Sequence, residues 1–229
     1  MASNNPRLAL AFAAAVTFVP VAAKATIAEA MKFDDKVEQA SSIVVGKVVK
    51  QESRWDESKR RILTYSTIQV EETLKGNQAG QTVIVTPGGQ VGDVAQAFVG
   101  IPRFNVGDEH VVFTRNTHAG PTVLFFEQGA YRVESDGRGE KIVRPLVSSA
   151  VLMDTQRGVA VAPEHARPLR EFTKEVRDSG RRIEAVRAKM IEQQRAEASF
   201  WGTIKRNKLL VILALAGALL ASWQLLRRQ

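Results

Sequence analysis

The chain has 229 residues, of which 45% are apolar and 24% charged, and its formal net charge is +8. This length fits one globular domain with extensions at its ends, and the balanced composition excludes a collagen-like chain or one that is disordered throughout. The absence of cysteine excludes disulfides, thiolate metal sites and cysteine nucleophiles.

Residues 1–25 have the profile of a secretion signal. A single basic residue, Arg7, precedes an apolar run at 8–23. Small residues of the kind that a signal peptidase reads follow, so we expect cleavage after Ala23 or Ala25. An uncleaved N-terminal anchor is the alternative, although Pro20 and the alanines near it suit a cleavage region better than a spanning helix.

The next segment, 26–40, is expected to form a short helix. Four of its apolar residues lie on a rough helical stripe. Thr26 with Glu29 three residues later is typical of a capping box at a helix N-terminus.

The segment 41–160 is predicted to be a mainly β domain. β-Branched and aromatic residues gather in short runs that glycine, proline and aspartate separate. These runs predict six or seven strands, at 43–52, 62–74, 82–86, 109–114, 122–126, 130–134 and 141–144. Short strands of this spacing favour a small OB-like β-barrel, or a sandwich, because closure removes exposed strand edges.

A basic helical stalk is predicted at 161–208. Six apolar residues follow heptad spacing, with Ser179 in one core position: Leu169, Phe172, Val176, Ile183, Val186 and Met190. As one continuous helix, residues 164–208 would span about 68 Å, whereas a bend near Gly180 would let the helix fold back on the β domain. Self-association through the heptads is a further prediction.

The C-terminal segment 209–226 is predicted to be a transmembrane helix, with 227–229 as a cytoplasmic tail. Its eighteen residues carry no charge. A helix of this length covers about 27 Å, close to the ~30 Å of a bilayer core. Basic residues flank both ends, and Trp201 and Trp223 stand where interfacial aromatics are expected. A buried core helix is the alternative.

Together the two ends predict a single-pass protein of the inner or cytoplasmic membrane. The export signal would send the mature N-terminus across, so the main domain would be extracytoplasmic, in the periplasm or cell envelope.

The positive charge is unevenly distributed along the chain. Residues 41–163 carry fourteen basic and thirteen acidic side chains, whereas 164–208 carry twelve and seven. A nearly neutral β domain argues against nucleic-acid binding. The basic excess lies next to the predicted span, where anionic lipid headgroups would attract it.

The sequence contains no recognisable catalytic, metal-binding or cofactor motif. His110, His118 and His165 lack the spacing of metal ligands. The neighbouring carboxylates at 71–72 and at 108–109 would point to opposite faces of a strand. We therefore predict no metal site and no cofactor, and we expect a protein that is not an enzyme.

A glycine-rich insertion at 86–109 is the most distinctive segment. Gly88, Gly89 and Gly92 allow backbone conformations that other residues avoid, and the amides of such a loop could hold a ligand oxygen. A tight turn with a bulge is the simpler explanation of the same glycines. The predicted contact surface consists of side chains from this loop: Gln90, Val91, Phe98, Ile101, Arg103 and Phe104.

Three stretches carry a resemblance to a known family: 41–49 (SSIVVGKVV), 68–76 (IQVEETLKG) and 104–113 (FNVGDEHVVF). Their pattern resembles the strands of netrin-like modules, which include the tissue metalloproteinase inhibitors, and is also similar to that of many exported bacterial proteins. The resemblance covers about 37–145 and implies an OB-type barrel. The inhibitors act through an N-terminal cysteine, which this chain lacks, so no inhibitory residue is implied.

The sequence thus predicts a membrane-anchored extracytoplasmic binding domain with a protein partner. One alternative is an envelope hydrolase whose carboxylates, such as Asp56, Glu57 or Asp93, are brought together only by the fold. Another is a structural spacer that acts through its helical stalk.

Overall fold

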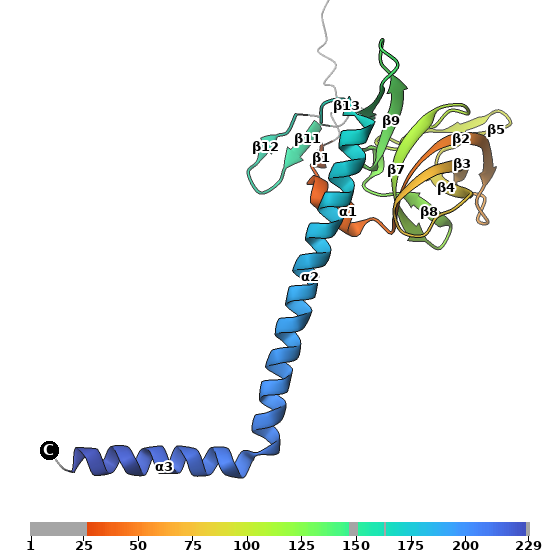
Figure 1. Ribbon diagram of the computed structural model, residues 1–229. Coiled ribbons are helices and arrows are strands. Elements are labelled where there is room, and N and C mark those ends of the chain that lie inside the picture. Colours follow the sequence, from red (N-terminus) through yellow and green to blue (C-terminus); the bar gives the residue numbers. More distant parts are fainter. Residues whose placement is uncertain (1–26, 147–150, 163, 228–229) are drawn as a thin grey trace, which may run out of the picture.

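The computed structural model describes residues 27–146, 151–162 and 164–227, so the predicted signal peptide lies outside the described residues. A β-rich body occupies one end of the molecule, and a long helix leads away from it (Figure 1). A second helix follows and runs in another direction. The expected mainly β domain followed by a long helix is confirmed.

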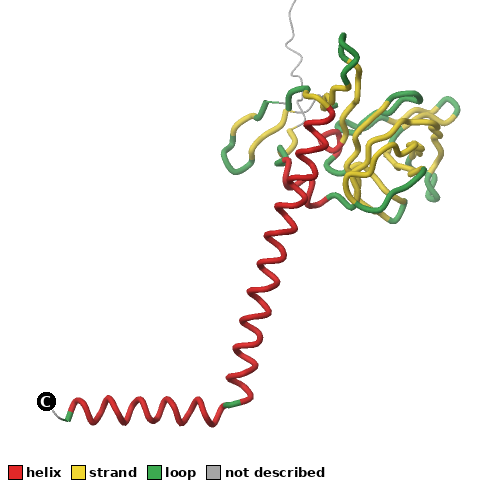
Figure 2. The backbone as a smooth tube through the Cα atoms, in the orientation of Figure 1, coloured by secondary structure: helices red, strands yellow, loops and turns green. Residues whose placement is uncertain are grey.

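The body is built around one large sheet, with strands in the order β13-β10-β9-β7-β2-β3-β4 and β8 paired to the far part of β7. Its strands are β2 (Ser42–Trp55), β3 (Ile62–Lys75), β4 (Gln81–Pro87), β7 (Glu109–Thr117), β8 (Gly120–Val123), β9 (Ala130–Ser135), β10 (Lys141–Pro145) and β13 (Arg167–Pro168). Figure 2 shows this sheet as a curled layer of strands. Register shifts between β2 and β3 mark bulges, which increase strand twist and bending.

Two smaller sheets complete the β structure. The hairpin of β5 (Gly89–Val91) and β6 (Val94–Gln96) lies within the glycine-rich insertion. β1 (Ile27–Glu29), β11 (Val151–Asp154) and β12 (Val159–Ala160) form a three-stranded sheet beside the body. The sequence predicted none of these five strands.

The large sheet curls without closing. β4 and β8 lie side by side, and a Cβ on Gly120 would be 3.4 Å from the Cγ2 of Val85. Within the described residues, however, no hydrogen-bonded ladder joins these two strands, so the closed form of the predicted barrel is not found. The physical reason is local: β8 ends at Val123, and the chain turns at Phe125 into the 3-10 helix η1 (Phe126–Gly129), where a strand at 122–126 was expected.

The first part of β2 is buried on both faces, which explains its run of apolar residues. Ile43 and Val45 point into one core cluster, and Val44 and Val48 into the other, as strand alternation requires. The first cluster includes side chains from α1 (Phe33–Gln39) and α2 (Leu169–Arg206), so these helices cover one face of the sheet.

The prediction of a helix at 26–40 is wrong for the first half of this segment. Residues 27–29 form β1, which pairs in parallel with Val151, Leu152 and Met153, and α1 begins only at Phe33. Lys32 takes the N-cap position and makes no side-chain cap hydrogen bond. Pairing with a distant strand therefore overrides the local helical stripe.

α1 is held to the body by a buried lysine. The side chain of Lys36 is 3% exposed, and its Nζ donates to Tyr131 Oη at 2.8 Å and forms an ion pair with Glu164. Phe172 of α2 packs edge-on against Phe33 and against Tyr131, with ring centroids 5.5 and 4.7 Å apart. The N-terminal helix, the central sheet and the start of α2 therefore form one folded unit.

α2 is a single helix of 38 residues that begins at Leu169 and not at 164. Its first half does fold onto the body: Phe172, Val176 and Ser179 are buried, and Ser179 Oγ donates to Asp34 at 2.5 Å. The second half leads away (Figure 1), and Val186 and Met190 are exposed there. The first heptads thus pack within the chain, and only the second half can serve as a stalk of about 35 Å.

α3 (Lys208–Leu226) follows α2 after Asn207. Leu213, Leu219 and Leu226 are among its exposed apolar side chains, while the side chains at 209–211, 221 and 225 are not described. Among the described residues, no helix combines the length and the apolar character needed to cross a membrane.

Candidate functional site

The β5–β6 hairpin depends on glycine where it leaves β4. Gly88 and Gly89 have φ of +99° and +126°, which non-glycine residues rarely adopt. A Cβ on Gly89 would also lie 2.3 Å from Thr64 Oγ1 and 2.4 Å from Ser53 Oγ, too close for any side chain. Glycine therefore lets the hairpin cross directly over the strands β2 and β3.

The tip of the hairpin is a two-residue turn between Val91 and Val94. Gly92 takes a φ of +57° there, and a Cβ would meet no atom within 4 Å. The side-chain amide of Gln90 donates back to the carbonyl of Gly92 at 3.1 Å. Gly92 thus serves the turn itself.

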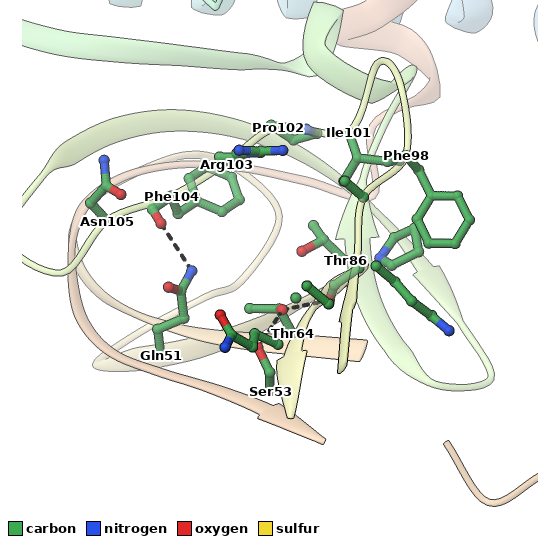
Figure 3. A pocket seen from close by; sticks show the side chains of 17 residues that line it. Gln51, Ser53, Thr64, Thr86, Phe98, Ile101, Pro102, Arg103, Phe104 and Asn105 are labelled. Atoms are coloured by element: carbon green, nitrogen blue, oxygen red, sulfur yellow. Dashed lines mark hydrogen bonds between the residues drawn. The ribbon is translucent and has the colours of Figure 1, made fainter. Parts of the chain in front are cut away.

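A polar groove with a volume of about 420 Å³ lies between this insertion and the strands β2 and β3. The loop residues Pro102 to Asn105 form one side, and Gln51, Ser53 and Thr64 face them from the other (Figure 3). Its lining combines hydroxyl groups, amide groups and glycine backbone with apolar side chains such as Ile101 and Pro102. Such a surface can form many hydrogen bonds with a ligand but carries little charge.

Hydrogen bonds fix the walls of the groove. Gln51 Nε2 donates to the carbonyl oxygen of Phe104 at 2.9 Å, which ties the loop to β2 (Figure 3). Thr64 Oγ1 donates to the carbonyl of Gly88 at 2.6 Å, and Ser53 Oγ lies 2.8 Å from Thr64 Oγ1. Gln96 accepts from the backbone of Ile62 at 2.8 Å. The groove is therefore formed before any ligand binds.

Most of the predicted contact residues lie at this groove. Its lining includes the predicted side chains Gln90, Phe98, Ile101, Arg103 and Phe104 and the predicted loop glycines Gly88 and Gly89. Val91 and Gly92 lie in the hairpin, outside the lining.

Phe104 does not fit its predicted role as an exposed contact side chain. It is 3% exposed, and its ring packs edge-on against His110 with centroids 4.9 Å apart. Its neighbours are the apolar residues of the second core cluster. Phe104 therefore anchors the loop to the core and offers the groove mainly its backbone.

The sequence prediction missed the strand side of the groove. Gln51 and Ser53 of β2 stand opposite Ser66 and Thr64 of β3 in the strand register. Their spacing of two residues in each strand places these polar side chains on one face. That alternation was the available signal, but the pairing register was needed to bring the four side chains together.

Among the described residues, the lining of the groove contains one charged residue, Arg103, and neither a carboxylate nor a histidine. The carboxylates considered for hydrolysis lie elsewhere. Asp56 Oδ1 accepts from the backbone N–H of Arg61 and of Arg60, and these hydrogen bonds lower the pKa of its carboxyl group. Asp56 thus serves the β2–β3 turn. Asp93 lies at the tip of the hairpin.

His110 lies below the groove and is fully buried. Neither of its ring nitrogens has a hydrogen-bond partner among the described residues, and burial lowers its pKa to about 4. It is therefore neutral at physiological pH and packs as a core side chain. No group of three or more potential metal ligands occurs in the described part of the chain.

The arrangement therefore offers hydrogen-bonding groups, one exposed aromatic side chain and one positive charge to a ligand, and no group suited to acid–base chemistry. Comparisons with family models, with curated proteins and with solved structures find no match to this chain.

Proposed function

We propose that this protein is an interaction domain that binds an extended segment of a partner protein in the polar groove, and that its C-terminal segment holds it at the outer face of a membrane. The observation that carries the binding proposal is the lining itself: hydroxyl and amide side chains, glycine backbone and Arg103 as the one charged residue.

The chemistry of the groove fits a polypeptide. Each peptide group carries one donor and one acceptor, and side-chain amides carry groups of both kinds. The amides of Gln51, Gln90 and Gln96 already make hydrogen bonds within the chain, so a peptide would use their remaining positions. Phe98, which is 47% exposed at the rim, adds an apolar surface for a side chain of the partner. Aromatic residues with this mixed polar surround are typical of protein interfaces.

The strand order supports an open OB-type barrel as the framework. β2, β3 and β4 follow one another, β7 pairs with β2, and β8 lies between β7 and β4. OB folds are partly open five-stranded barrels that bind ligands on one face and in adjoining loops. The proposed relationship to netrin-like modules concerns this architecture only.

The membrane part of the proposal rests on the sequence. Residues 209–226 carry no charge, and the described side chains of α3 are apolar and exposed along much of the helix. A helix that is apolar all round needs an apolar environment. Extraction of membranes at alkaline pH tests this part: the chain should stay in the membrane pellet, and release into the supernatant would contradict it.

Site-specific photo-crosslinking tests the binding proposal. A photoreactive amino acid at Ala97, which lines the groove, should give a covalent adduct with one partner in intact cells. The same amino acid at Val83, which is 41% exposed on β4 and outside the groove, is the positional control.

A charge variant sharpens this experiment. Arg103→Ala should weaken the adduct formed at Ala97, whereas Arg115→Ala, an exposed residue of β7 outside the groove, should leave it unchanged. Equal adducts from Ala97 and Val83, or no adduct from Ala97, would contradict the proposal.

The spacer alternative concerns only the exposed second half of α2. Shortening the helix by whole heptads beyond Met190 should leave the crosslink at Ala97 intact if the groove is the functional part. Loss of function with an intact crosslink would favour the spacer. The hydrolase alternative receives no support from the groove, because its lining offers no general base.

A further inference from the structure

Two further hollows lie along the insertion beyond the polar groove. A middle hollow shares Phe98, Ile101 and Arg103 with the groove. It also shares Val99, Gly100 and Glu127 with a third hollow, of about 380 Å³, whose walls include Ile27, Phe126 and Leu152. The three hollows therefore adjoin one another along loop 97–101.

Phe126 in the third hollow is held in an unfavourable way. Phe125 and Phe126 have φ of +53° and +58°, in the left-handed region that bulky residues avoid. Phe126 is nevertheless 61% exposed, and Val99, which lines the same hollow, is 59% exposed. Burial of the aromatic side chain therefore cannot compensate for this backbone conformation, and another cause must maintain it.

Hydrogen bonds to two other segments of the chain support this conformation. The backbone N–H of Glu127 donates to the carbonyl of Gly100 at 2.8 Å. Gln128 accepts from the N–H of Met31 at 2.9 Å and donates to the carbonyl of Glu29 at 2.8 Å. These hydrogen bonds hold the backbone next to Phe126 while its side chain stays exposed to the solvent, and strained residues of this kind cluster at binding sites.

Two buried polar atoms of the middle hollow lack partners. Within the described residues, Glu127 Oε2 and Arg132 Nε are buried and make no hydrogen bond, although the Nη2 atom of Arg132 pairs with Asp108 at 3.4 Å. One is an acceptor and the other a donor, and both residues line the same hollow. A peptide group is complementary to this pair, because it offers one N–H and one C=O.

We propose that the hollow around Phe126 is a second subsite, which takes a bulky apolar side chain of the partner segment, while Glu127 and Arg132 receive an adjacent peptide group. This inference rests on the proposed function and specifies its ligand: an extended peptide with an apolar anchor.

A selection from random peptides displayed on phage tests the subsite. The full chain in phosphatidylcholine nanodiscs is the target, and selected peptides are synthesised with a fluorophore for anisotropy titrations. We expect an aromatic or large aliphatic residue at a fixed position, and its replacement by alanine should weaken binding about tenfold or more.

Phe126→Asn is the decisive variant. Asparagine tolerates the left-handed conformation, so this change should not destabilise the fold, yet it should weaken peptide binding about tenfold or more. Val106→Asn is the matched control, because Val106 is also 61% exposed but lines none of the three hollows. Glu127→Ala should weaken binding as well.

The outcomes separate this inference from the proposed function. Peptides that depend on Arg103 but bind the Phe126→Asn variant as tightly as the unchanged chain would overturn the second subsite and leave the polar groove in place. Failure to select any peptide would contradict both. The subsite would also be overturned if the selected peptides need an apolar residue but Phe126→Asn and Val106→Asn weaken their binding equally.

Discussion

We expect this protein to lose stability between pH 7.5 and pH 5, and replacing His110 by leucine should remove most of that loss. His110 is fully buried, and neither ring nitrogen has a described hydrogen-bond partner. Burial is the main cause that lowers its pKa from 6.5 to about 4, because the charged imidazolium is poorly solvated there.

The direction of this pH dependence follows from proton uptake in the folded and unfolded states. The unfolded chain takes up a proton at this histidine near pH 6.5, whereas the folded chain does so only near pH 4. Between these values the unfolded state binds more protons, so the free energy of unfolding falls as the pH falls. For pH 5 compared with pH 7.5 the loss is about 2 kcal/mol.

Leucine is close to histidine in volume and takes up no proton. His110→Leu should therefore have a nearly flat stability over this range, and at pH 7.5 it should lie within about 1 kcal/mol of the unchanged chain. The assay is guanidinium unfolding followed by the fluorescence of Trp55, in a chain whose Trp201 and Trp223 are phenylalanine.

His118→Gln is the control, since His118 is exposed in the turn after β7 and its replacement should preserve the loss. If His110→Leu lost as much stability at pH 5 as the unchanged chain, the burial argument for His110 would be refuted.

Two further predictions concern the hairpin and α2. Gly89→Ala should lower the free energy of unfolding by about 2 kcal/mol or more, because its Cβ would overlap Thr64, whereas Gly92→Ala should lower it by about 1 kcal/mol. Guanidinium unfolding measures both losses. Equal losses would contradict the close crossing of the hairpin over β2 and β3. Phe172→Ala should cost about 3–5 kcal/mol and expose the start of α2 to protease, whereas the exposed Met190→Ala should change stability by less than about 0.5 kcal/mol; unchanged protease resistance of Phe172→Ala would contradict the packing of α2 on the body.

Local patterns in the sequence were sufficient for the main strands. β2, β3, β4, β7, β9 and β10 all coincide with predicted runs, because β-branched residues and the glycine or proline turns between them act over a few positions. The heptad pattern likewise identified α2. It could not reveal the partner of that helix, since Phe172 and Val176 pack on the body of the same chain.

The short strands could not be predicted from local sequence. Ile27 pairs with Val151, and Ile142 with Pro168. Two or three residues carry too weak a periodic signal, and only hydrogen bonding to a distant segment gives them a strand conformation. The pairing of Ile27 with Val151 also explains why the first part of the helix expected at 26–40 is a strand.

The candidate site divides in the same way. The glycines of the insertion marked the loop side of the groove, because positive φ angles have a strong local signature. Gln51, Ser53 and Thr64 became part of the site only through the register of β2 with β3 and the crossing of the hairpin above them. The sequence by itself determined the six main strands, the long helix α2, the near-neutral charge of the β domain and the apolar character of the C-terminal segment. The tertiary structure decided which faces meet, because contacts between residues far apart in the chain depend on register and packing, which no local pattern encodes.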